Sequence, residues 1–290
     1  MRYYIDAARF QFRRIDSSTW DQEIGFLKTR FGSIRLRDTK GDKPAIVIIP
    51  DGPNIIEHYH ELVEKLRADF RLLIFDLLGF GFSFHNGEYD YSFSKTSELI
   101  REILDHFNLK SVHLAFPCAN GFFGLAFTQA YPERVRQLVL IQTPALPEMA
   151  KWTARIVPNY LKIPIVGQLT MPWIEKTFAH RWYEYALPKG KDRSGYQKIA
   201  LEGIHQGACF CLSSLTQGLT REINTDFKID PAIPVMSIYG KNDFTHKTTN
   251  FESLKTYAPN TQFVAFDQCG HFPDLEFPQE YSALLREKLS

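Results

Sequence analysis

Short, continuous apolar runs alternate along this chain with stretches whose apolar residues recur at helical spacing. The runs lie at residues 45–49, 70–75, 112–116, 138–142, 234–239 and 261–266. Between two of them, Leu99, Ile100, Ile103, Leu104 and Phe107 form a helical stripe. A continuous apolar run is typical of a strand buried on both faces, and strands that alternate with helices form parallel sheets. The sequence therefore predicts an α/β fold with a mostly parallel central sheet and helices on both faces.

Other segments depart from this alternation and predict the domain organisation. Residues 24–38 alternate apolar and polar and predict a two-stranded antiparallel lead-in with its turn at Gly32. Residues 144–222 are rich in aromatic residues and proline, and they show no convincing buried strand. We expect short helical pieces there, forming a helical cap over the strand ends. The predicted core is thus 24–143 with 223–290, preceded by an N-terminal extension at 1–23.

Composition narrows the classes of function. The 290 residues have a formal net charge of +1, which gives no electrostatic signature of nucleic-acid binding. No apolar run approaches the roughly 20 residues that span a bilayer, and the N-terminus lacks a signal-peptide core. The four cysteines form neither a metal-type pair nor a disulfide framework, which is typical of a reduced, cytoplasmic protein. No metal, nucleotide or flavin motif is present, so we expect no cofactor, and the oligomeric state is open.

Reactive side chains follow several of the predicted strands. Cys118 comes directly after the strand 112–116, Asp243 after the strand 234–239, and His271 after the strand 261–266. Ligands of an open parallel sheet bind outside the carboxyl ends of its strands. We therefore expect a thiol, a carboxylate and an imidazole to converge at one edge of the sheet.

At these residues the chain resembles the α/β-hydrolase fold superfamily, in particular members with a helical cap. The resemblance covers about residues 24–289 and depends on D-L-L-G-F-G-F-S (76–83), Y-P-E-R-V (131–135), G-K-N-D (240–243) and C-G-H-F-P-D-L-E (269–276). In that superfamily the nucleophile stands fourteen residues before the proline of Y-P-E-R-V. Counting back from Pro132 gives Cys118, within the segment F-P-C-A-N where the superfamily has G-x-S-x-G.

The resemblance implies a role for each of these residues. Cys118 would be the nucleophile, His271 its base, and Asp243 the carboxylate that fixes the imidazole tautomer. The backbone amides of Ala119 and Gly52 would form the oxyanion hole. Glu148 is a weaker alternative for the acid.

Four substitutions relative to the family pattern bear on activity. Cysteine replaces serine, as it does in dienelactone hydrolases. Phe116 and Asn120 replace the two glycines of the turn, so Phe116 must push the neighbouring strand or fill the floor of the active site, where it would contact substrate. Asp51 stands where the family has glycine, and its charge would oppose an oxyanion unless it points away.

Other polar residues near the motifs have structural explanations. We expect Asp76 and Ser83 to brace their turn, and Asp274 and Glu276 to be structural. His58 and His60 are expected to make solvent or cap contacts, because no third metal ligand accompanies them.

The aromatic residues of 144–222 either form a small core of the cap or line an apolar pocket. Trp152, Tyr160 and Trp173 are the candidates for the pocket. The leading hypothesis is a cysteine-dependent hydrolase that cleaves an apolar ester or thioester, free or carrier-bound, through an acyl-cysteine. The same acyl-enzyme would also serve an acyltransferase or cyclase. A catalytically inactive relative that binds a ligand or partner is the third possibility.

Overall fold

The centre of the molecule is a sheet whose strands coincide with the predicted apolar runs. A computed structural model describes residues 2–13, 15, 18 and 20–289. In this part of the chain the main sheet has nine strands, eight of them in the order β1-β2-β4-β3-β7-β8-β10-β11. The strands β4-β3-β7-β8-β10-β11 run parallel to one another. In chain order their bounds are β3 (Ala45–Ile48), β4 (Arg71–Phe75), β7 (Val112–Pro117), β8 (Val135–Ile141), β10 (Val235–Gly240) and β11 (Gln262–Phe266). The α/β class and the mostly parallel sheet are confirmed.

Burial along the strands follows their place in the sheet. Every residue of β3 and β7 is buried, because both strands have neighbours on each side and helices on both faces. At the far edge, every residue of β11 is exposed or half-buried. The continuous apolar runs therefore mark buried strands in the interior of the sheet, with one exception. The run at 261–266, expected to be buried on both faces, forms an edge strand without a buried residue.

The antiparallel lead-in also forms as predicted. Strands β1 (Ile24–Thr29) and β2 (Gly32–Asp38) pair antiparallel, and β2 continues antiparallel onto β4. A two-residue strand, β6 (Phe84–His85), pairs with the start of β2.

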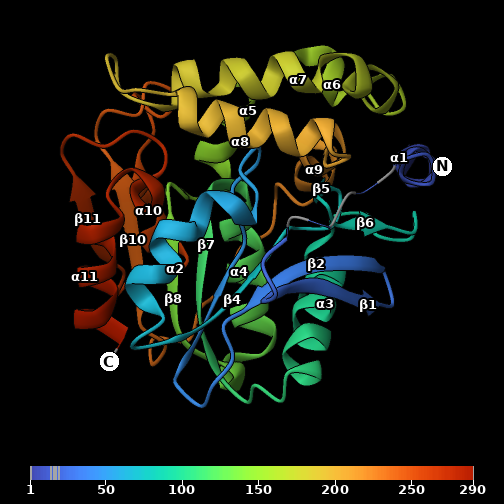
Figure 1. Ribbon diagram of the computed structural model, residues 1–290. Helices are drawn as coiled ribbons and strands as arrows, with labels where there is room; N and C mark the ends of the chain where they lie inside the picture. The colour runs from blue at the N-terminus through green and yellow to red at the C-terminus, as the bar shows by residue number, and fades with distance from the viewer. Residues whose placement is uncertain (1, 14, 16–17, 19, 290) are drawn as a thin grey trace.

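Helices cover both faces of the sheet (Figure 1). α2 (His60–Leu66) packs against α11 (Pro278–Leu289), while α3 (Phe93–His106) packs against α4 (Gly121–Ala130). Shorter elements connect them: η1 (Ile56–Tyr59), η2 (Cys118–Asn120), η3 (Pro132–Arg134), η4 (Phe251–Thr256) and α10 (Pro273–Glu276). α11 begins at its proline, as the sequence indicates.

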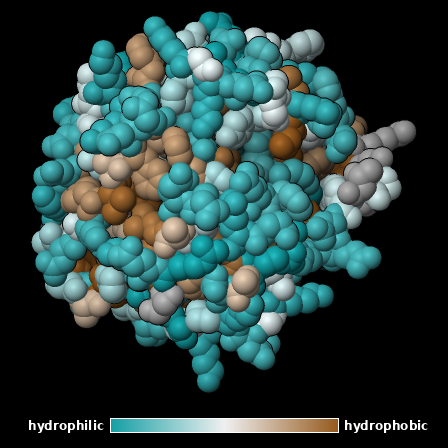
Figure 2. All heavy atoms as spheres, turned by 60° about the vertical axis from the view of Figure 1, so that its left-hand side comes forward, coloured by the Kyte–Doolittle hydropathy of each residue, from teal (hydrophilic) through white to brown (hydrophobic). Residues whose placement is uncertain are grey.

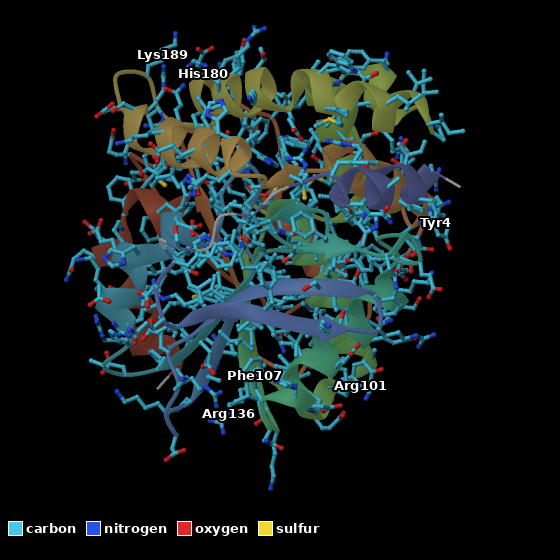
Figure 3. The ribbon with its side chains drawn as sticks, turned by 45° about the vertical axis from the view of Figure 1, so that its right-hand side comes forward. Tyr4, Arg101, Phe107, Arg136, His180 and Lys189 are labelled. Atoms are coloured by element: carbon cyan, nitrogen blue, oxygen red, sulfur yellow. The ribbon has the colours of Figure 1, made fainter. Side chains whose placement is uncertain are left out.

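The segment 144–222 is mainly helical and lies above the sheet in Figure 1. Its helices are α5 (Leu146–Ile156), α6 (Asn159–Lys162), α7 (Val166–Ala186), α8 (Ser194–His205) and α9 (Leu212–Arg221). On α7, Trp182 and Tyr183 are buried, whereas His180 projects outward, on the same side of the molecule as Lys189 (Figure 3). Among the described residues, no helix combines the length and the apolar character needed to cross a membrane.

Two expectations for this segment are wrong. α7 continues for 21 residues through Pro172, because its packing against α6, α8 and α9 outweighs the backbone hydrogen bond that proline removes. A short buried strand is also present: β9 (Cys209–Phe210) pairs with β5 (Phe80–Gly81), outside the main sheet. Two residues are too few to give a periodic signal.

The predicted N-terminal extension contains a helix that docks on the rest of the protein. α1 (Arg2–Phe10) contacts α7, and the buried Glu175 on α7 accepts hydrogen bonds from Arg9 at 3.3 Å and Arg13 at 2.8 Å. Asp6, also buried, accepts a hydrogen bond from the Ser214 hydroxyl. These polar pairs, together with the buried side chains of Tyr3 and Phe10, attach the extension to the rest of the protein.

Candidate functional site

Cys118 lies at the sharp turn between strand β7 and helix α4. Its φ of 48° is in the left-handed region, which side-chain-bearing residues rarely adopt. A strained strand-to-helix turn of this kind exposes a nucleophile at the end of the sheet. The side chain is only 3% exposed, so the sulfur faces the interior.

The structure brings the three residues of the predicted triad together. Ligand atoms of Cys118 and His271 lie within 4.8 Å of each other. Nδ1 of His271 is 2.6 Å from Oδ2 of Asp243, which also accepts a hydrogen bond from Nε2 of Gln142 at 3.0 Å. The other carboxylate oxygen, Oδ1, accepts hydrogen bonds from the backbone and hydroxyl of Thr245. Asp243 is therefore fixed on the ring.

Asp51 makes the second contact to the imidazole. Its Oδ2 lies 2.9 Å from Nε2 of His271, the ring nitrogen that a base would use toward the thiol. We expected the charge of Asp51 to oppose an oxyanion unless its side chain pointed away from the site. In the structure the side chain points into the site. Both side chains are buried, and the histidine gives the carboxylate the partner that a buried charge requires.

The pKa values show how this contact sets the resting state. Burial would lower the pKa of His271, but Asp243 and Asp51 together raise it well above its ordinary value. Burial raises the pKa of the Cys118 thiol to about 11, and the charge of Asp51 adds to this rise. Hydrogen bonds from His271 and the Ala119 amide offset it only in part. The resting site therefore holds a neutral thiol beside an imidazolium.

The two predicted oxyanion residues both reach the cavity at Cys118. Ala119 and Gly52 line it, and the Ala119 amide points at the sulfur. The Asn120 side chain connects the turn to the neighbouring loop by donating a hydrogen bond to the Pro50 carbonyl at 3.1 Å. A serine-type turn has glycine at position 120 and cannot make this bond.

Phe116 does not line the cavity, contrary to expectation. Its ring is fully buried beneath α4, where a Cβ added to Gly124 would lie 3.1 Å from it. The room for the ring comes from that glycine, so Phe116 does not need to displace the next strand. The backbone changes direction between Phe116 and Cys118, so the Phe116 side chain points away from the site.

An apolar cavity of about 220 Å³ begins at Cys118 and extends beneath the helices of 144–222. Trp152 lines it, as predicted, together with Phe80, Leu146, Met149, Phe178 and Leu215. Lys162 lies among the lining residues, away from the polar groups at Cys118. The cavity can therefore accept an apolar chain whose reacting end meets the sulfur.

Two predicted pocket residues lie elsewhere. Trp173 is 86% exposed on α7, and Tyr160 is 42% exposed beside a separate outer groove of about 510 Å³. Ile156, Phe178 and Trp182 line both spaces and separate them. Figure 2 shows apolar residues gathered in one part of the surface, surrounded by hydrophilic ones. Aromatic content alone could not tell the inner face of a helix from its outer face.

The remaining polar residues take mostly structural places. Asp76 and Ser83 accept hydrogen bonds from backbone amides, which braces their turn as expected. Glu276 accepts from the amides of Gly270 and Phe272 and holds the loop of His271. Asp274 accepts a hydrogen bond from the Tyr59 hydroxyl.

The alternative acid, Glu148, bonds to Lys151 and to the Asn250 amide, and the triad contacts are made by Asp243 instead. His58 is stacked against Tyr183 and Tyr196 from the segment 144–222, in agreement with the expected cap contacts.

Sequence reasoning missed two residues that contact this site. Gln142, with a φ of 51°, holds Asp243. His246 is stacked on the His271 ring with centroids 5.3 Å apart. The only sequence signal for His246 is its place three residues after Asp243 on the same loop.

Comparison with known proteins places this geometry in context. Residues 44–164 match a family model described as alpha/beta hydrolase fold. The chain is 25% identical over 244 residues to Lipase 3 of Moraxella sp. (strain TA144), covering 82% of this chain and 75% of that protein. It is 23% identical over 248 residues to pimeloyl-[acyl-carrier protein] methyl ester esterase of Nitrosomonas europaea, covering 84% and 95%.

Solved structures agree with the fold. Epoxide Hydrolase A from Mycobacterium thermoresistibile superposes with a TM-score of 0.75 at 14% identity, over 91% of this chain and 97% of that one. A bromoperoxidase from Bacillus anthracis gives a TM-score of 0.71 at 17% identity, over 92% and 99%. At such identities the likeness establishes the fold alone.

Proposed function

Because the chain belongs to the α/β-hydrolase fold superfamily, we propose that it is a hydrolase that cleaves an apolar ester or thioester through an acyl-Cys118 intermediate. The observation that carries the proposal is the left-handed backbone of Cys118 at the turn. This backbone conformation supports a position of the sulfur beside the His271–Asp243 pair, where the apolar cavity begins.

The proposed reaction has two halves. The thiol gives its proton to Nε2 of His271 while sulfur bonds to the carbonyl carbon, and the amides of Ala119 and Gly52 hold the oxyanion. The bond from carbon to the leaving oxygen or sulfur then breaks, and the leaving group takes the proton from His271. Water attacks the acyl-cysteine with His271 as base, and its addition releases the acid and restores the thiol.

Before the first half can occur, the proton on Nε2 of His271 must pass to Asp51 or to solvent, and Asp51 must leave the ring nitrogen. In the resting arrangement Nε2 donates to Asp51 and has no lone pair for the thiol proton. We expect the substrate, by filling the cavity beside Asp51, to disturb this contact. In the resting protein the sulfur of Cys118 is therefore a thiol and not the more reactive thiolate.

The lining of the cavity defines the class of substrate. Apart from Asp51 near the sulfur and Lys162, no ionisable carboxylate or ammonium group of the described residues lines it. An aliphatic or aromatic acyl group fits such a wall. The esterase of Nitrosomonas europaea is named for a carrier-bound ester, so acyl groups on a carrier belong to the substrates to be tested.

Mass spectrometry of the intact protein tests the proposal. Incubation with p-nitrophenyl esters of increasing acyl length should add one acyl mass to the wild-type protein and none to Cys118→Ala. Cys211→Ala is the matched control, since Cys211 is also buried but lies in a different cluster, and it should still be acylated. Absence of an adduct at every chain length would contradict the proposal. Product analysis with added amines or alcohols separates hydrolysis from acyl transfer.

A further inference from the structure

His246 has no task in the proposed hydrolysis, yet it completes a cluster of donor atoms at Cys118. One ligand atom each from Cys118, His246 and His271 lie within 4.8 Å of one another, and all three residues are buried. We propose that these three residues bind a divalent transition-metal ion, for which Zn²⁺ is the best chemical match, and that the Asp51 carboxylate moves from Nε2 of His271 onto the ion as the fourth ligand. The proposal goes beyond the hydrolase function and does not depend on it.

The first support is an unpartnered nitrogen. Nε2 of His246 is buried and has no hydrogen-bond partner among the described residues, although the side chain is only 4% exposed. A buried polar atom left without a partner is destabilising, so each instance calls for an explanation such as an ion.

The second support is the orientation of the two rings. Nδ1 of His271 is held by Asp243 at 2.6 Å, and Nδ1 of His246 by the Thr249 hydroxyl at 3.0 Å. Metal-binding histidines almost always have their second nitrogen fixed in this way. Among the described residues Nε2 of His246 has no partner, and Nε2 of His271 becomes available when it loses its proton and Asp51 leaves it.

The distances also fit a tetrahedral site. With zinc–nitrogen bonds of about 2.0–2.1 Å, the centroids of two ligating imidazoles lie roughly 5 Å apart. The rings of His246 and His271 are separated by 5.3 Å. Ligand atoms of one tetrahedral zinc ion lie roughly 3.3–3.8 Å apart. The ligand atoms of Cys118, His246 and His271 lie within 4.8 Å of one another, so they would move slightly closer together when the ion binds.

The charges balance when the ion binds. The ion brings two positive charges, which the Cys118 thiolate and the Asp51 carboxylate neutralise, while both imidazoles are neutral ligands. The thiol proton and the proton on Nε2 of His271 leave to solvent, so two protons are released for each ion bound. Asp51, which contacts Nε2 of His271 in the resting site, would exchange this hydrogen bond for a bond to the ion.

A second cluster brings ligand atoms of Asp6, His85 and Cys211 equally close. There, however, the Asp6 carboxylate already accepts hydrogen bonds from Arg9 and the Ser214 hydroxyl, so its charge is compensated. This cluster is therefore the weaker candidate, and it supplies matched control variants.

A cobalt titration tests the proposal. Reduced protein freed of metal with a chelator is titrated with Co²⁺, and we expect one equivalent to give a thiolate-to-cobalt charge-transfer band and tetrahedral d–d bands. Cys118→Ala should abolish the charge-transfer band, and Cys118→Ser should do the same while keeping the side-chain size. His246→Gln should weaken binding at least about tenfold. His85→Gln and Cys211→Ser should bind as the wild type does.

Circular dichroism and thermal melts establish that each variant is folded. Absence of the charge-transfer band in the wild type, its persistence in Cys118→Ala, or its loss in Cys211→Ser alone would overturn the proposal. Acylation is measured separately by mass on chelator-treated protein, so metal binding and hydrolysis can each fail without the other. His85→Gln, which lies outside the proposed triad and the proposed metal site, should still be acylated.

Discussion

At the scale of single residues, the site depends on two carboxylates that bind opposite nitrogens of one imidazole. Asp243 on Nδ1 gives His271 the orientation that a base needs. Asp51 on Nε2 keeps a proton on the nitrogen that must accept one. The same type of side chain therefore supports the reaction on one side of the ring and restrains it on the other.

This opposition leads to a prediction for a pair of variants. Asp51→Asn removes the charge that holds the Nε2 proton, so acylation of Cys118 by p-nitrophenyl esters should become severalfold faster. Asp243→Asn disturbs the tautomer and should slow acylation at least about tenfold. Stopped-time mass spectra of the chelator-treated proteins measure both rates. Equal loss of rate in the two variants would show that Asp51 assists the chemistry and does not restrain it.

At the scale of elements, the turn between β7 and α4 is adapted to its unusual residues by glycines further along the helix. Gly121 lies against Thr143, whose hydroxyl donates a hydrogen bond to the Cys118 carbonyl at 2.9 Å. Gly124 makes room for the Phe116 ring. Gly121 and Gly124 therefore allow the close approach of helix and strand that the family's glycine at position 120 would otherwise provide.

A substitution at Gly121 tests this account. A Cβ there would lie 2.2 Å from the Thr143 hydroxyl oxygen, so Gly121→Ala should lower the free energy of unfolding by about 1–3 kcal/mol through overpacking. Gly195→Ala on α8 is the control, because nothing lies within 4 Å of its Cβ, and it should be neutral or stabilising by up to about 1 kcal/mol. Urea denaturation measures both. An unaltered midpoint for Gly121→Ala would contradict the packing described.

At the scale of the whole molecule, several carboxyl groups are buried where few cations reach them. Asp274 is 2% exposed, accepts a hydrogen bond from the Tyr59 hydroxyl, and is faced by Tyr281 and the charge of Asp51. Burial, the largest cause, raises its pKa from 3.8 to about 7. A buried carboxyl of this kind makes global stability depend on pH.

The sign of that dependence follows from linkage. The folded state binds the Asp274 proton more tightly than the unfolded state, so this contribution to stability is complete below pH 3.8 and is lost as the pH rises through about 7. At about 1.36 kcal/mol per pKa unit, the loss amounts to a few kcal/mol. Asp274→Asn keeps an acceptor for Tyr59 without ionising, so its stability relative to wild type should increase across this range. Parallel stability–pH curves for the two proteins, from urea denaturation, would contradict this assignment.

Much of the core could be predicted from sequence because its strands are buried on both faces. Runs such as 112–116 and 138–142 coincide with β7 and β8 to within three residues at either end. The order of Cys118, Asp243 and His271 along the chain also indicated the site, since parallel strands end at one edge. In contrast, α1, the uninterrupted α7 and the short β9 have weak local signals, and tertiary contacts stabilise them.

The sequence by itself determined the fold class and the three residues that meet at the end of the sheet, because periodicity and chain order are local properties. Only the tertiary structure decided where the neighbouring side chains point. Asp51 reaches His271 from 220 positions away in the chain, Phe116 turns under α4, and Trp173 faces outward. Such orientations depend on which surfaces the folded chain brings together, and no pattern of adjacent residues encodes them.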